Sequence, residues 1–167
     1  MRVFMIIACT KPYLVLSNPG YVRFSLNEFS LENFEKDKIT HLTNNSVQKK
    51  HPDYAAMKEK SIMSVDDLKQ HLAAAGKISS TSEFDSKVLA PINEIMTLVF
   101  KTVESKLDKM FGCFELFGFD FMVDENLKPY LIEINTNPAL FTDTAVQKDM
   151  LPKLVDDSVA MALKLHP

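Results

Sequence analysis

The chain has 167 residues, of which 46% are hydrophobic and 25% are charged, and this is the profile of one globular domain with a buried core. Such a composition excludes a disordered tail and a small disulfide-stabilised protein. With 19 basic and 22 acidic residues the net charge is −3, so the overall charge gives no reason to expect a nucleic acid or an anionic membrane as a partner.

The predicted elements begin with three strands, over residues 3–9, 13–17 and 21–25, and turn residues at 18–20 separate the last two. The chain therefore begins within a sheet, which leaves open whether Met1 is the natural start or a start inside a longer protein. The apolar run of the first strand is cut too early for a signal peptide, and no stretch approaches the roughly 20 apolar residues of a membrane span.

Residues 27–60 are polar and locally basic, and they predict a solvated loop. Ser64 then stands at N-cap spacing before two acidic residues, which predicts a helix over residues 64–75 that Gly76 ends. The remaining predicted elements are a helix over residues 84–110, a hairpin of strands over 113–123 and 130–135, and a helix over 144–165. This order predicts an α+β fold with an antiparallel sheet.

The two cysteines, Cys9 and Cys113, lack the spacing of zinc ligands, so neither a zinc site nor a disulfide framework is expected and a reducing compartment fits best. Candidate ligands of another kind lie on the predicted hairpin. Asp120 is on its first strand, and Glu133 and Asn135 share one face of the second because strand side chains alternate.

Asp120 can lie close to Glu133 across the hairpin, although the sequence leaves the register open. Two carboxylates and an amide among apolar neighbours would need a counter-charge, and oxygen ligands with no His or Cys nearby favour Mg²⁺. On spacing alone a plainer alternative is favoured, in which one acid faces solvent at the strand edge and Asn135 starts a turn.

Two segments resemble motifs of a known family. Residues 113–138 read CFELFGFDFMVDENLKPYLIEINTNP and resemble the C-terminal signature of the tubulin–tyrosine ligase-like family, whose members are ATP-grasp ligases. Residues 41–50 read HLTNNSVQKK and are similar to that family's His-Leu-Thr-Asn motif, which a basic pair follows. Arg2 resembles the arginine of the family's Asp-x-Arg element, and Arg23 falls where the family carries an arginine in the next strand.

The resemblance implies an ATP-grasp-like C-terminal portion, in which helices flank a mainly antiparallel sheet. Residues 1–167 would form a partial domain without the N-terminal lobe, whose lysines grip ATP, so the isolated chain is expected to be inactive. The implied roles are Mg²⁺ binding by Asp120, Glu133 and Asn135, nucleotide contacts by Thr43, Asn44 and Ile132, and charge neutralisation by Arg2 and Arg23.

The implied function is ATP-dependent ligation of glycine or glutamate to carboxylates of tubulin or another protein through an acyl-phosphate, with ATP and Mg²⁺ as cofactors. Partners would be acidic tubulin or microtubule tails and a free amino acid, rather than a nucleic acid or a membrane. The implied location is cytoplasmic, on the cytoskeleton or in the cilium or axoneme. The alternative is a catalytically inactive, truncated ATP-grasp module that binds microtubule tails. The basic residues between 49 and 60 would contact such a tail or simply face solvent.

Overall fold

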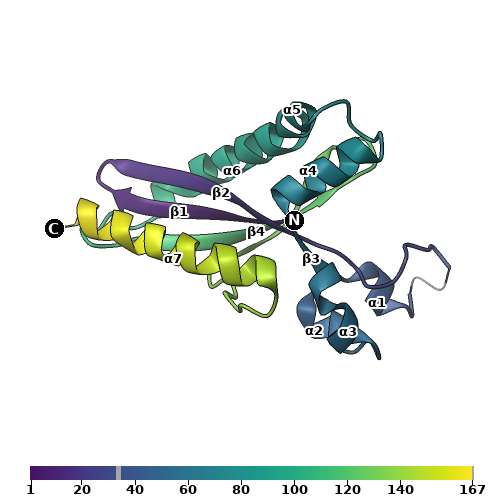
Figure 1. The fold of residues 1–167 in the computed structure, drawn as a ribbon. Helices are drawn as coiled ribbons and strands as arrows, with labels where there is room; N and C mark the ends of the chain where they lie inside the picture. The colour runs from purple at the N-terminus through teal and green to yellow at the C-terminus, as the bar shows by residue number, and fades with distance from the viewer. Residues whose placement is uncertain (33–34, 167) are drawn as a thin grey trace.

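The strands of the computed structural model, which describes residues 1–32 and 35–166, are β1 (Arg2–Thr10), β2 (Tyr13–Arg23), β3 (Ile62–Ser64), β4 (Glu115–Val123) and β5 (Pro129–Asn135). They form one sheet in the order β3-β2-β1-β4-β5, and every neighbouring pair is antiparallel (Figure 1). The sheet and its flanking helices confirm the predicted α+β class.

The helices are α1 (Lys38–His41), α2 (Asn45–Gln48), α3 (Tyr54–Met57), α4 (Val65–Ala74), α5 (Thr81–Phe84), α6 (Ala90–Val103) and α7 (Ala145–Leu165). Three further turns are the 3₁₀ segments η1 (Lys58–Ser61) and η3 (Glu104–Lys106) and the π segment η2 (Asp85–Leu89). Figure 1 shows α7 on one side of the sheet and α4, α5 and α6 on the other. The short helices α1–α3 gather beyond the end of the sheet at which β3 lies.

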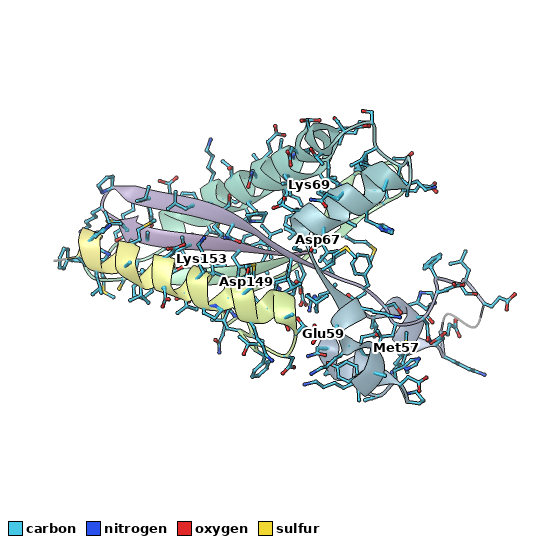
Figure 2. All side chains as sticks on the ribbon, viewed as in Figure 1. Met57, Glu59, Asp67, Lys69, Asp149 and Lys153 are labelled. Atoms are coloured by element: carbon cyan, nitrogen blue, oxygen red, sulfur yellow. The ribbon has the colours of Figure 1, made fainter. Side chains whose placement is uncertain are left out.

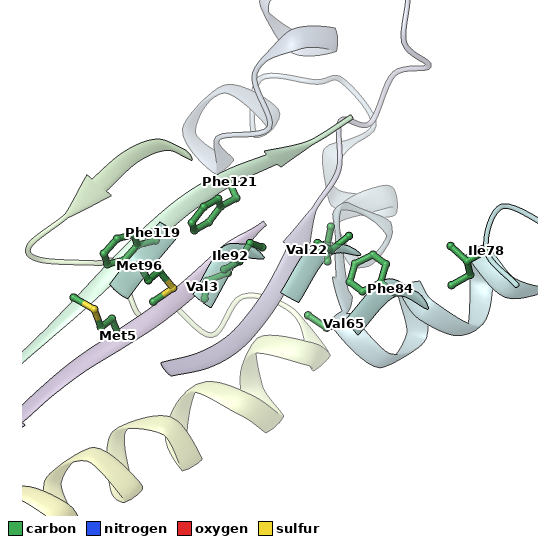
Figure 3. Close-up of a cluster of buried hydrophobic side chains, with 11 residues drawn as sticks. Val3, Met5, Val22, Val65, Ile78, Phe84, Ile92, Met96, Phe119 and Phe121 are labelled. Carbon is green, nitrogen blue, oxygen red and sulfur yellow. The ribbon is translucent and has the colours of Figure 1, made fainter. Parts of the chain in front are cut away.

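Both faces of the central strand β1 are buried, because its alternate side chains enter two hydrophobic clusters. Val3 and Met5 pack with the side chains of α4–α6 and with Phe119, as Figure 3 shows. Phe4 points the other way and packs with Tyr21 and the buried face of α7. The continuous apolar sequence of residues 3–9 thus reflects a strand that is covered on both sides.

The predicted start of two helices is confirmed by their caps. The Ser64 side chain accepts a hydrogen bond from the backbone N–H of Asp67 at the start of α4. Thr144 and Gln147 form a reciprocal capping box at the start of α7, in which each side chain bonds the other residue's backbone N–H. Cap spacing at Ser64 and apolar periodicity after Thr144 were therefore sufficient signals for these helices.

The turn predicted at residues 18–20 is wrong, because β2 continues through it as a single strand. The pairing passes from Phe4 opposite Asn18 to Arg2 opposite Tyr21, so β2 carries one extra residue there. Asn18 accepts a hydrogen bond from the Gly20 N–H, and Gly20 has φ +64°, where a Cβ would come within 1.9 Å of the Arg2 carbonyl oxygen. The turn residues thus form a β-bulge instead of a chain reversal.

The prediction of a loop over residues 27–60 is also wrong for the described part of that segment. Residues 33–34 lie outside the described residues. The segment contains α1, α2, α3 and η1, and it leads directly into β3, a strand that the sequence did not predict. Its interior is polar: Thr40, Gln48 and Ser61 are all buried. Because these side chains replace an apolar core, the segment has no hydrophobic periodicity by which a helix could be recognised.

The long helix predicted over residues 84–110 begins earlier and ends earlier than expected. It starts with α5 at Thr81, and the π-helical turn η2 connects α5 to α6. It ends with η3 at Lys106. In η2 the Ala90 N–H bonds the Asp85 carbonyl five residues back. Pro91 at the start of α6 has no N–H to donate, which accounts for an irregular turn immediately before it.

Phe84 provides a test of the larger cluster, since its ring is 1% exposed between α5 and the sheet. We expect Phe84→Ala to lower the free energy of unfolding by about 3–5 kcal/mol, because it removes buried contacts and leaves a cavity. Phe111→Ala is the matched control, because that ring is 76% exposed. Urea denaturation of both variants measures the difference, and equal losses would contradict this account of the core.

Candidate functional site

The carboxylate of Asp120 on β4 is held between two arginines. Arg2 on β1 donates from Nε to Oδ1 at 2.7 Å and from Nη2 to Oδ2 at 3.1 Å. Arg23 at the end of β2 donates from Nη2 to Oδ1 at 2.6 Å. The three side chains are only 8–16% exposed, so this charge cluster is largely shielded from water.

The two guanidinium groups change the acidity of Asp120. Burial alone would raise the pKa of its carboxyl, but the hydrogen bond from Arg2 and the charges of Arg23 and Arg2 outweigh that effect. The pKa of Asp120 therefore lies below its ordinary value. The carboxylate remains ionised and fixes the position of both arginines.

Glu133 on β5 is the register partner of Asp120, which places the two acidic residues opposite each other on the same face of the sheet. Asn135 lies two residues further along that face and donates from Nδ2 to Glu133 Oε1 at 3.2 Å. The structure thus brings together the three residues for which the sequence suggested metal binding. Their role as metal ligands remains a prediction.

An irregularity in the pairing of β4 with β5 sets this register. Phe121 pairs with Leu131, whereas Asp120 pairs with Glu133, so Ile132 is an additional residue on β5. The bulge allows Leu131 to pack against the larger hydrophobic cluster while Glu133 faces the opposite side of the sheet. In a regular strand Leu131 and Glu133, which are two residues apart, would share one face.

A cavity of about 370 Å³ opens on the face that carries these polar residues. Six of the eight residues singled out from the sequence line it, namely Arg2, Arg23, Thr43, Asn44, Glu133 and Asn135. Asp120 is not among the described residues that line it, but its carboxylate accepts hydrogen bonds from Arg2 and Arg23, which do. Ile132 is not a lining residue either; its side chain is 60% exposed on the edge strand β5.

Gly118 on β4 allows Arg2 and Pro138 to approach the strand closely. A Cβ at this position would lie 2.8 Å from Pro138 Cβ and 3.0 Å from an Arg2 guanidinium nitrogen. The absence of a side chain therefore lets the Arg2 side chain and the loop after β5 approach the same point of the strand.

Contacts that the sequence did not predict join the short helices to the loop after β5. Lys49 Nζ lies 3.1 Å from Asp143 Oδ2, Asn45 donates to the same oxygen, and Lys58 donates to the Asp143 carbonyl. The hydrogen bond from Lys49 lowers the pKa of the Asp143 carboxyl. Two lysines of the basic stretch are thus engaged within the chain, and no local pattern in the sequence indicates their distant partner.

Glu59 provides another connection of this kind, because its Oε2 accepts a hydrogen bond from the Ala145 N–H at 3.0 Å. Figure 2 places Glu59 beside the first turn of α7. The segment over residues 38–61 is consequently fixed to the start of α7, and both segments contribute residues that line the cavity.

The donor atoms of the site fit a hard divalent cation, since carboxylate and amide oxygens are the ligands that Mg²⁺ prefers. Glu133 could supply a carboxylate oxygen, and Asn135 retains its Oδ1 because Nδ2 makes the bond to Glu133. Asp120 could contribute only by sharing oxygens that already accept from Arg2 and Arg23. No group of three His, Cys, Asp or Glu side chains that could hold a metal ion occurs in the described residues, and the candidate set here includes an amide.

The arrangement combines two kinds of binding group in one cavity. Arg2 and Arg23 can hold an anion through charged hydrogen bonds, and Glu133 with Asn135 can hold a cation close to it. Such a pair of sites suits a phosphate or carboxylate that is bound together with a metal ion.

Known proteins of one family are similar to this chain. A model of the family described as "Tubulin-tyrosine ligase family" matches residues 1–166. Protein polyglycylase TTLL10 of Rattus norvegicus is 35% identical over 98% of this chain and 24% of its own length. Inactive polyglycylase TTLL10 of Homo sapiens is 33% identical over the same shares of both chains. Probable tubulin polyglutamylase TTLL2 of Mus musculus is 32% identical over 96% of this chain and 29% of its own length.

The chain therefore spans about a quarter of the length of the curated relatives that it matches. Across residues 1–32 and 35–166, none of the helices combines the length and apolar character needed to cross a membrane.

Proposed function

Because the chain belongs to the tubulin-tyrosine ligase family, we propose that it forms the cation-binding and carboxylate-binding part of an ATP-dependent ligase. The reaction would join glycine or glutamate to a carboxylate of tubulin or another protein, with ATP and Mg²⁺ as cofactors. Relatives named as a polyglycylase and as a probable tubulin polyglutamylase support both amino acids. Tubulin as the acceptor would place the chain on the cytoskeleton, including the cilium or axoneme.

The observation that carries the proposal is the single cavity shared by Arg2, Arg23 and Glu133. A carboxylate reacts poorly with an amine, so the ligation requires transfer of the γ-phosphoryl group of ATP to the acceptor carboxylate. The amine of the amino acid then forms the amide bond, a proton is lost and phosphate leaves. In both steps the phosphoryl group and the acceptor carboxylate carry negative charge, which the two fixed guanidinium groups would neutralise.

The residues of this chain would act by binding and orienting the reactants. Arg2 and Arg23 would hold the transferred phosphoryl group and the acceptor carboxylate, while Asp120 keeps both guanidinium groups in position. Glu133 and Asn135 would hold Mg²⁺, with Asp120 as a shared third ligand. When bound, this ion would offset the charge of the nucleotide phosphates. Thr43 and Asn44 would contact the nucleotide from the opposite wall.

Titration with a non-hydrolysable ATP analogue tests the proposal, with MgCl₂ present or replaced by EDTA. Binding is the readout because the chain spans about a quarter of its relatives' length. We expect saturable binding that requires Mg²⁺. Absence of binding at millimolar analogue, or equal binding in EDTA, would overturn the proposal.

The alternative function is a catalytically inactive module that recognises acidic tubulin tails, and the human relative named as an inactive polyglycylase favours it. Such a module would bind a Glu-rich tail peptide with the same affinity in EDTA and in Mg²⁺–nucleotide. A ligase site would instead bind the peptide more tightly when the cation and nucleotide are present, because all three would meet in one cavity.

Ile132 tests the nucleotide contact separately. Since its side chain is 60% exposed, we expect Ile132→Ala to leave the melting temperature nearly unchanged. If Ile132 contacts the adenine or ribose, loss of this apolar contact should weaken analogue binding several-fold. Leu163→Ala, at a site 69% exposed on α7, is the matched control and should bind the analogue normally. Unchanged binding by Ile132→Ala would remove this residue from the site.

A further inference from the structure

Gln48 is a buried polar residue that the proposed chemistry does not use. Its side chain is 1% exposed, and its amide makes three hydrogen bonds. Nε2 donates to the carbonyl oxygens of Ile39 at 2.6 Å and Leu42 at 2.7 Å, and Oε1 accepts from the Leu26 N–H at 2.9 Å. Two carbonyl acceptors and one N–H donor match the amide in one orientation only.

These bonds join α1 to two segments that adjoin residues lining the cavity. Leu26 follows the end of β2, which carries Arg23; Ile39 lies in α1; and Leu42 immediately precedes Thr43. Gln48 itself is the last residue of α2, the helix that Asn44 caps. One side chain therefore connects the arginine-bearing strand end to the turn that carries Thr43 and Asn44.

The internal bonds of that turn do not replace this connection. Asn44 accepts from the Ser46 N–H at 3.0 Å, which shapes the start of α2 but reaches no other segment. The tie between Asn45 and Asp143 fixes the turn to the loop after β5. Gln48 joins the turn to the residues after β2. Ser25 and Asn27 in that segment also bond α1, but neither bonds the Thr43–Asn44 turn.

We infer that Gln48 is a positioning residue for the cavity. It sets the Thr43–Asn44 turn relative to Arg23, and this geometry determines the affinity for the nucleotide, a consequence that rests on the proposed function. Gln48 also lines the cavity, and the groups of its amide are engaged by three partners within the chain. It acts by holding two groups of ligand-binding residues at a fixed separation, so its loss should misplace one group relative to the other.

The test compares Gln48→Met with Ser158→Ala. Methionine keeps the length of the side chain and removes all three hydrogen bonds. Ser158 is also buried, and its Oγ bonds only the Leu154 carbonyl within α7, so its variant controls for a general loss of stability. Binding of Mn²⁺ alone and of the Mn²⁺–ATP analogue is measured by calorimetry, and amide hydrogen exchange is measured at Ser46.

We expect Gln48→Met to weaken binding of the analogue by about 10- to 100-fold and to leave the affinity for Mn²⁺ alone within about 2-fold. Exchange at Ser46 should become faster, although its own acceptor, Asn44 Oδ1, is untouched. Ser158→Ala should lower the melting temperature without either change. Equal losses of analogue affinity in the two variants, or unchanged exchange at Ser46 in Gln48→Met, would overturn the positioning role.

A second variant guards against failure of Gln48→Met to fold. Gln48→Asn keeps the amide group but is one methylene too short to reach all three partners, and we expect the same direction of change. If the unmodified chain binds no analogue, the proposed function fails. The claim that Gln48 holds the Thr43–Asn44 turn in place is tested separately, and it fails if amide exchange at Ser46 is the same in the variants and the unmodified chain.

Discussion

Replacement of Asp120 by Asn should lower the free energy of unfolding by about 2–4 kcal/mol, because Arg2 and Arg23 would then face each other without a counter-charge. For a chain of this size the loss corresponds to a decrease in Tm of about 5–15 °C. Thermal and urea denaturation measure the effect. The fold should remain intact, since the variant changes no apolar contact of either hydrophobic cluster.

Asp66→Asn is the matched control for Asp120→Asn. Asp66 also forms an ion pair, with Lys69 at 3.4 Å, but its side chain is 84% exposed on the surface of α4. Solvent-exposed pairs contribute little to stability, so this variant should melt close to the unmodified chain. Similar losses in the two variants would show that the Arg2–Asp120–Arg23 cluster has no special energetic weight.

The pH dependence of the same variant follows from the lowered pKa of Asp120. The unfolded chain takes up this proton near pH 4, whereas the folded chain takes it up at a lower pH. The stabilisation by Asp120 is therefore fully present above about pH 4 and is lost as the pH falls through the folded pKa. The difference in stability between the chain and Asp120→Asn should shrink on acidification below pH 4.

Glu133→Gln should produce the largest loss of ligand binding. The substitution keeps the shape of the side chain but removes the one charge with which Glu133 could offset a divalent cation. We expect Mn²⁺ alone and the Mg²⁺-dependent ATP analogue to bind at least about 10-fold more weakly. Calorimetric titration measures both affinities.

The stability of Glu133→Gln provides its internal control. Glu133 is exposed, and the protein bond in which it takes part comes from Asn135 Nδ2, which an amide oxygen can also accept. The Tm should therefore remain within about 2 °C of the unmodified chain. Unchanged cation and analogue affinities would show that Glu133 has no part in binding.

The sequence predicted the helices and strands where local chemistry and burial agree. Ser64 and Thr144 mark true helix starts, and the apolar residues 3–9 form a strand that is buried on both faces. The predictions failed at residues 18–20, where the same residue types suit a turn and a bulge. The tertiary pairing of β1 with β2 decides between these structures, and no local pattern contains that information.

For the candidate site, the sequence indicated most of the residues but not the contacts between them. The family resemblance indicated Arg2, Thr43, Asn44 and Glu133, which the fold brings to one cavity. The sequence could not show that Asp120 pairs with two arginines, because those contacts span 97 and 118 residues of the chain. Gln48 stands within the second motif, yet its three partners become evident only in the folded structure.

The bulges at Gly20 and Ile132 have a consequence for how this part of the family can vary in sequence. Each adds one residue to a strand beside the central β1–β4 pair, and each thereby reverses which side chains of that strand reach the cavity. Substitutions can change the groups at the site one at a time. Deletion of Gly20 or Ile132 would restore regular alternation and leave Arg23 and Glu133 on the cavity face. A straightened strand that kept the extra residue would instead turn these side chains toward the hydrophobic cluster, so each extra residue and its bulge should be kept or lost together.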